Sequence, residues 1–134
     1  MEELIKRICA SVGIDEDTAK ISIGHVLGFL QKEFPEGPVA ELLGKIPGGQ
    51  DAIAAAAAAP GSGGLDSLLG GLGGLVGGAK GDIMALAGKL TGLGLDMGQI
   101  QKLGTEIFAH ADQLIGKENV DKIVAQIPAL AQFR

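Results

Sequence analysis

The side chains that most often carry out chemistry are sparse in this chain. Of its 134 residues two are histidine, His25 and His110, and one is cysteine, Cys9. A metal site needs several converging ligands, and no other ligand type is spaced to join either histidine locally. His110 follows Glu106 by four residues, a spacing that allows a side-chain hydrogen bond on a helix. We therefore expect no metal site, and a structural or solvated role for each histidine.

The cysteine and the carboxylates also have structural explanations. Cys9 falls on the apolar stripe of a predicted helix, which indicates an inert, buried thiol. A single cysteine excludes an intrachain disulfide and a thiolate metal site. The carboxylates gather at predicted helix starts, where they interact with the helix dipole; they are Glu2, Glu3, Glu16 and Asp17. We therefore predict no catalytic residues and expect that the protein is not an enzyme.

Glycine-rich runs suggest phosphate loops, but their context does not fit. A Walker loop ends in Gly-Lys-Ser/Thr, and a Rossmann turn follows a strand. The run at residues 78–82, Gly-Ala-Lys-Gly-Asp, has neither feature. The formal net charge of −5 and the lack of Trp and Tyr remove both the electrostatic and the stacking contribution to nucleic-acid binding. We expect no cofactor and no nucleic-acid partner.

Apolar spacing predicts helices in the first part of the chain. Residues at three- and four-residue intervals predict helices over 2–12, 16–34 and 38–46. Gly13 suits the end of the first helix, and Asp15 suits the N-cap of the second. No segment alternates as a half-buried strand does. The sequence therefore predicts an all-α fold.

The same pattern recurs at an offset of 81 residues. Gly13 aligns with Gly94, and Ile46-Pro47 aligns with Ile127-Pro128. Asp96 is followed three residues later by Gln99, the spacing of a capping box. One unit this short buries its apolar faces poorly alone. We therefore predict an antiparallel helical bundle built from two three-helix units related by a pseudo-twofold axis.

The predicted domain is a single one over residues 1–134. Its parts are a first helical repeat over 1–50, an Ala/Gly-rich connector over 51–80, and a second helical repeat over 81–134. Small residues four apart let helices approach closely. Gly24 and Gly28 have this spacing, and Thr105 and Ala109 repeat it at the 81-residue offset. We expect close contact of the two central helices there, with a dimer contact as the alternative.

The connector has opposing tendencies. Residues 52–59 predict a helix because seven of the eight are alanine, whereas ten of the 21 residues over 61–81 are glycine. Its apolar residues still keep helical spacing; they are Leu68, Leu69, Leu72, Leu75 and Val76. We expect helix only where these side chains dock, and interpret them as an interaction or lipid surface. The uncharged stretches are shorter than the roughly 20 residues that span a membrane.

The chain resembles the VcgC/VcgE-like family of bacterial proteins of unknown function. The resemblance runs through Val12-Gly13-Ile14, Ala19, Gly24, Ile46-Pro47-Gly48, the Gly/Leu-rich middle and Leu93-Gly94-Leu95. It implies a bacterial origin and a helical fold, and it supplies no activity and no site residue. Members of such families are often exported. The N-terminal residues lack the apolar run of a secretory signal, so we expect a cytoplasmic protein, or a periplasmic or exported one if a signal has been removed.

Two functions remain open at this point. The chain is rich in aliphatic residues and has no catalytic or metal-binding pattern. This favours a non-enzymatic helical module for protein interaction or self-association, and hence a homo-oligomer. The alternative is a protein that binds an apolar ligand or a membrane surface through its Gly/Leu-rich segment.

Overall fold

The computed structural model describes residues 2–34, 36–58 and 86–133, and these ranges contain helices and turns without a strand. The elements are α1 (Glu2–Val12), α2 (Glu16–Glu33), α3 (Pro38–Lys45), α4 (Gly49–Ala58), α7 (Met97–Ile115), α8 (Lys117–Gln126) and the 3-10 helix η1 (Pro128–Phe133). A further helical segment covers residues 86–92. The all-α prediction is therefore confirmed.

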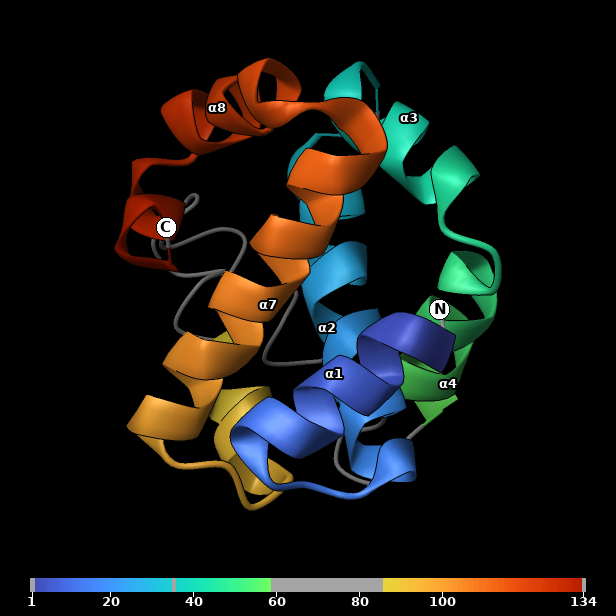
Figure 1. Cartoon of the computed structure of the whole chain (residues 1–134), viewed down its shortest axis with the longest axis vertical. Coiled ribbons are helices and arrows are strands. Elements are labelled where there is room, and N and C mark those ends of the chain that lie inside the picture. Colours follow the sequence, from blue (N-terminus) through green and yellow to red (C-terminus); the bar gives the residue numbers. More distant parts are fainter. Residues whose placement is uncertain (1, 35, 59–85, 134) are drawn as a thin grey trace.

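The two longest of these helices, α2 and α7, run through the middle of the molecule (Figure 1). α1 crosses α7 near one end, whereas α3 and α8 contact each other near the opposite end. α4 packs along α2, and η1 contacts both α7 and α8. This arrangement places α7 in contact with elements from both parts of the chain.

The turns that set these helices follow the sequence signals. Gly13 and Gly94 have φ angles of 81° and 93°, the left-handed region that glycine enters without a steric penalty. Asp15 and Asp96 occupy the N-caps of α2 and α7. The predicted capping box of Asp96 is present, whereas the side chain of Asp15 makes no capping hydrogen bond.

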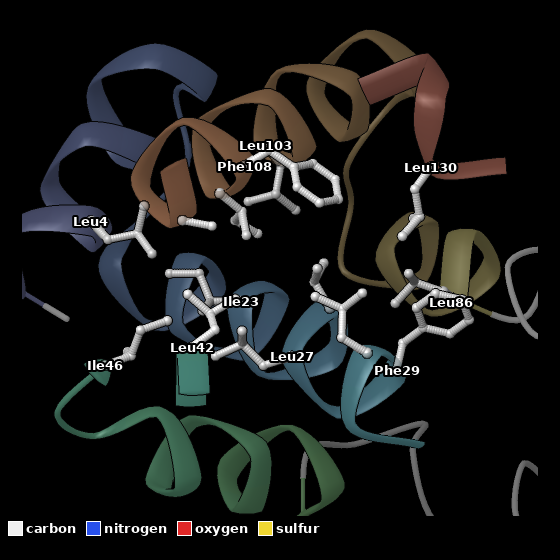
Figure 2. Close-up of a cluster of buried hydrophobic side chains, with 14 of the residues drawn as sticks. Leu4, Ile23, Leu27, Phe29, Leu42, Ile46, Leu86, Leu103, Phe108 and Leu130 are labelled. Atoms are coloured by element: carbon white, nitrogen blue, oxygen red, sulfur yellow. The ribbon is translucent and has the colours of Figure 1, made fainter. Parts of the chain in front are cut away.

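The core is mostly aliphatic, with Phe29 and Phe108 as its buried aromatic residues, and it joins both parts of the chain in one cluster of buried side chains. Leu4 of α1, Ile23 of α2, Leu42 of α3 and Leu103 of α7 are at most 1% exposed, and Figure 2 shows them within this cluster. Because burial of each such side chain stabilises the fold by roughly 1.5–3 kcal/mol, the cluster fixes how α7 lies against α1, α2 and α3.

The expected close contact at Gly24 has a different partner. We expected α2 to meet α7 there, but a Cβ added to Gly24 would overlap the Ala52 carbonyl oxygen of α4 and lie 2.8 Å from the Ala56 Cβ. At Gly28 the nearest atom is Ile53 Cγ2 of α4, at 3.6 Å. Because most side chains of α4 are alanine methyl groups, α4 can approach the α2 backbone closely. It therefore covers the face of α2 that carries Gly24 and Gly28.

Candidate apolar binding pocket

A pocket of about 220 Å³ lies beside the N-terminal half of α7. Its deep wall is formed by buried side chains, each at most 6% exposed: Val26 of α2, Leu103 and Phe108 of α7, and Leu130 of η1. Figure 2 shows Leu103, Phe108 and Leu130 facing the side of the core where Leu86 also lies. Four separate elements of the chain thus contribute to one apolar space.

The mouth of the pocket lies at the first turns of α7. Three of the lining residues there are exposed: Met97, Gly98 and Gln101. Met97 is 71% exposed, and it is the one exposed large apolar residue among those that the structure describes. An apolar group can therefore reach the buried wall from solvent past a flexible thioether side chain.

Hydrogen bonds hold the mouth in place. Asp96 Oδ1 accepts from the Gln99 amide at 2.7 Å, and Gln99 Oε1 accepts from the Asp96 amide at 2.9 Å. The Gln99 Nε2 group also donates to the Val12 carbonyl at the end of α1, at 3.2 Å. The capping box thus fixes the start of α7 and ties it to α1.

Besides Leu130, η1 contributes Phe133 to the lining. The Phe133 ring stands over Gly104, since a Cβ on Gly104 would lie 2.5 Å from Phe133 Cδ1. Thr105 Oγ1 donates to the Phe133 carbonyl at 3.1 Å, which anchors η1 on α7. Thr105, expected at a contact between the central helices, therefore serves the contact of α7 with η1. Ala109 is half-buried on the same helix.

The chemistry of this pocket is that of an apolar binding site. Among the described residues that line it, none is charged, and Gln101 is the only one with a hydrogen-bonding side chain. A dry apolar cavity of about 150 Å³ already accepts a benzene-sized molecule. The pocket therefore has the size and lining to hold a small apolar group.

A second polar feature joins α1 to α7. Glu106 accepts from Arg7 Nη2 at 3.1 Å and from Ser11 Oγ at 3.2 Å. The spacing allowed a Glu106–His110 hydrogen bond, but Glu106 makes these two instead. His110 Nδ1 is buried with no hydrogen-bond partner among the described residues. Burial, the N-terminus and Arg7 lower the pKa of His110. These surroundings favour the neutral form of the imidazole.

The remaining chemical side chains are dispersed. His25 is buried within α2, and Cys9 is half-buried against the core, where burial and the nearby Glu16 and Asp15 carboxylates raise the pKa of its thiol. A raised pKa keeps this thiol protonated and unreactive. In the part of the chain that the structure describes, no group of three His, Cys, Asp or Glu side chains could hold a metal ion.

The expected interaction surface of the connector lies outside the described residues. This applies to all five of its members, Leu68, Leu69, Leu72, Leu75 and Val76. Within the described ranges, no helix combines the length and apolar character needed to cross a bilayer.

Sequence reasoning missed the pocket because its lining comes from segments distant in the chain. The one local signal for the pocket was the position of Met97 and Gln101. They lie outside the main apolar stripe of α7 but within about one turn of each other. Comparison with protein family models, curated proteins and solved structures gives no match.

Proposed function

We propose that this protein is a non-enzymatic binding module that holds a small apolar ligand in the pocket beside α7. The observation that carries the proposal is the pocket itself, with its buried apolar wall and its exposed mouth. Protein interiors are close-packed, with few voids larger than a water molecule. Each ligand methylene buried there would contribute about 0.8 kcal/mol to binding.

The 81-residue offset in the sequence relates matched positions in the two parts of the chain. We propose that residues 1–50 and 81–134 are two three-helix units related by a pseudo-twofold axis. The matched positions Val39 and Val120 are both fully buried, and Leu42 and Ile123 are both 1% exposed. The hydrogen bond from Ile46 to the Leu42 carbonyl has its equivalent, at the same 3.1 Å, between Ile127 and Ile123.

At this offset four of the pocket residues correspond to polar or charged residues of the first unit. Met97, Gly98, Gln101 and Leu103 align with Glu16, Asp17, Lys20 and Ser22 respectively. If the bundle alone determined these positions, both units would carry residues of similar polarity. At these four positions the two units thus differ in charge or polarity, which favours a task specific to the second unit.

Filling the pocket tests the proposal. Ala87 lines the pocket and is half-buried, so Ala87→Leu adds three carbons to the space that a ligand would occupy. We expect this variant to bind octanol at least about tenfold more weakly, the loss of roughly 1.4 kcal/mol that two buried methylenes represent. Isothermal titration calorimetry with the purified chain measures the affinity.

The matched control for this experiment is Ala40→Leu. Ala40 is exposed on α3, which does not line the pocket, so its replacement makes the same chemical change elsewhere. We expect wild-type affinity for octanol in this variant. Equal affinities in the wild type and in Ala87→Leu would overturn the assignment of the pocket as the binding site.

A second candidate, self-association, rests on Met97. Its exposed side chain stands at the mouth of the pocket, where it could insert into an apolar surface of a second copy. The face of Gly24 that suggested a dimer is covered by α4 and supports no such contact. We expect Met97→Gln to remove any concentration-dependent mass increase seen by light scattering; a mass equal to that of the monomer at all concentrations in the wild type would rule this candidate out.

Membership of the VcgC/VcgE-like family stays part of the proposal. Its support is the set of short motifs around Gly13 and Gly94, and both glycines adopt left-handed turns in this chain.

A further inference from the structure

The carboxylate of Asp96 lies next to Gly98, a residue of the pocket mouth, although Asp96 itself does not line the pocket. A Cβ built on Gly98, which lines the mouth, would lie 3.3 Å from Asp96 Oδ1. This oxygen is held by the Gln99 amide at 2.7 Å, and the Gln99 side chain returns a hydrogen bond to the Asp96 amide. The capping box therefore holds the negative charge close to Gly98, just outside the uncharged lining.

This carboxylate changes what the start of α7 can bind. An uncapped helix N-terminus attracts anions through its free amides and its dipole. Here Asp96 already occupies that position within the capping box. Among the described residues of the pocket there is no Lys, Arg or His to compensate a second negative charge. An anionic group that reached Gly98 would therefore meet a like charge at short range.

We propose that Asp96 makes the pocket selective for neutral over anionic amphiphiles. The inference rests on the proposed function, because it assumes that an aliphatic chain enters the pocket. The buried wall of Val26, Phe108 and Leu130 accepts the chain, so the polar end of the ligand stays at the mouth beside Gly98 and Gln101. An alcohol or another uncharged group fits there, whereas a carboxylate is repelled.

Octanol and octanoate test this selectivity because they share a chain and differ in the charge of the polar end. Their affinities are measured by calorimetry at about pH 8, where an aliphatic carboxylic acid is ionised. We expect Asp96→Asn to bind octanoate about fivefold more tightly than the wild type, since two unit charges about 4 Å apart in water interact by about this factor. Octanol affinity is measured on the same variant, so that the ratio of the two affinities reports the effect of the charge, because asparagine caps a helix as well as aspartate does.

Glu36→Gln is the matched control. Glu36 is exposed between α2 and α3 and does not line the pocket, so its replacement changes the net charge equally without altering the mouth. We expect the wild-type ratio of the two affinities in this variant. If octanol binds but Asp96→Asn leaves the octanoate affinity unchanged, the role of Asp96 in selectivity is overturned and the proposed function is not. A failure of both ligands to bind any variant would overturn the proposed function as well.

Discussion

Two side chains on α7 show how local environment decides the role of a polar residue. Asp96 is exposed and forms the capping box of α7, so its charge lies next to Gly98 without a cost in burial. His110 is half-buried against α1, and its Nδ1 atom has no hydrogen-bond partner among the described residues. The first residue is a candidate for ligand selection, whereas the second links stability to pH.

The lowered pKa of His110 predicts a loss of stability in mild acid. Burial disfavours the imidazolium, and the N-terminus and Arg7 of α1 add repulsion that Glu3 only partly offsets. The unfolded chain therefore binds a proton at a higher pH than the folded chain does. The contribution of His110 to stability is complete above the unfolded pKa of about 6.5 and falls as the pH drops below it.

Urea unfolding at a series of pH values measures this dependence. We expect the free energy of unfolding of the wild type to decrease between about pH 7 and pH 5, and we expect a smaller decrease in His110→Gln. His25 is retained in both proteins, so the difference between the two profiles isolates His110. Identical profiles would show that the imidazole titrates equally in the folded and unfolded chains.

Among the elements, the contact between α2 and α4 depends most directly on one missing side chain. Gly24→Ala would place a Cβ against the Ala52 carbonyl, which belongs to the backbone and cannot rotate away. We expect this variant to lose about 1–3 kcal/mol of unfolding free energy through overpacking. Thermal unfolding followed by circular dichroism measures the loss.

Gly28→Ala provides the contrasting change on the same helix. Its new Cβ would lie 3.6 Å from Ile53 Cγ2, an ordinary contact distance. Because glycine within a helix costs roughly 0.5–1 kcal/mol relative to alanine, we expect this variant to be more stable than the wild type. Equal effects of the two substitutions would contradict the close approach of α4 at Gly24.

The elements themselves were largely predictable, because helix boundaries depend on local chemistry. The predicted first helix matches α1 at residues 2–12, and Pro38 starts α3 as expected. The alanine run predicted a helix over 52–59, whereas α4 starts three residues earlier, at Gly49, after the left-handed turn at Gly48. The prediction failed for the helix that packs against Gly24. The residues around Gly24 do not indicate whether α4 or α7 is the neighbouring helix.

The pocket could not be predicted for the same reason, and it is a property of the whole molecule. Its wall combines Val26 of α2 with Phe108 of α7 and Leu130 of η1, residues separated by more than half of the chain. Their meeting depends on the angle at which α7 crosses its neighbours, and that angle is set by the complete core. Apolar residues can be identified from the sequence. Which of them line a cavity depends on the tertiary packing, which the sequence pattern does not give.

A shared core predicts that the two parts of the chain unfold together. Ile123 of α8 is 1% exposed, and its cluster of buried side chains extends to Ile23 of α2. We expect Ile123→Val to lower the free energy of unfolding by about 0.5–1.5 kcal/mol. In a cooperative domain the most protected amides all exchange through global unfolding, so their protection in α2 should fall by the same amount as in α7.

Native-state hydrogen exchange followed by NMR separates this outcome from independent unfolding. If residues 86–133 opened as a unit of their own, Ile123→Val would lower protection in α7 and α8 and leave the amides of α2 as they are in the wild type. The reciprocal substitution, Ile23→Val in α2, makes the same chemical change in the first part of the chain. Equal losses in α2 and α7 for both variants require that the wall of the pocket and the contact with α4 depend on one folding equilibrium.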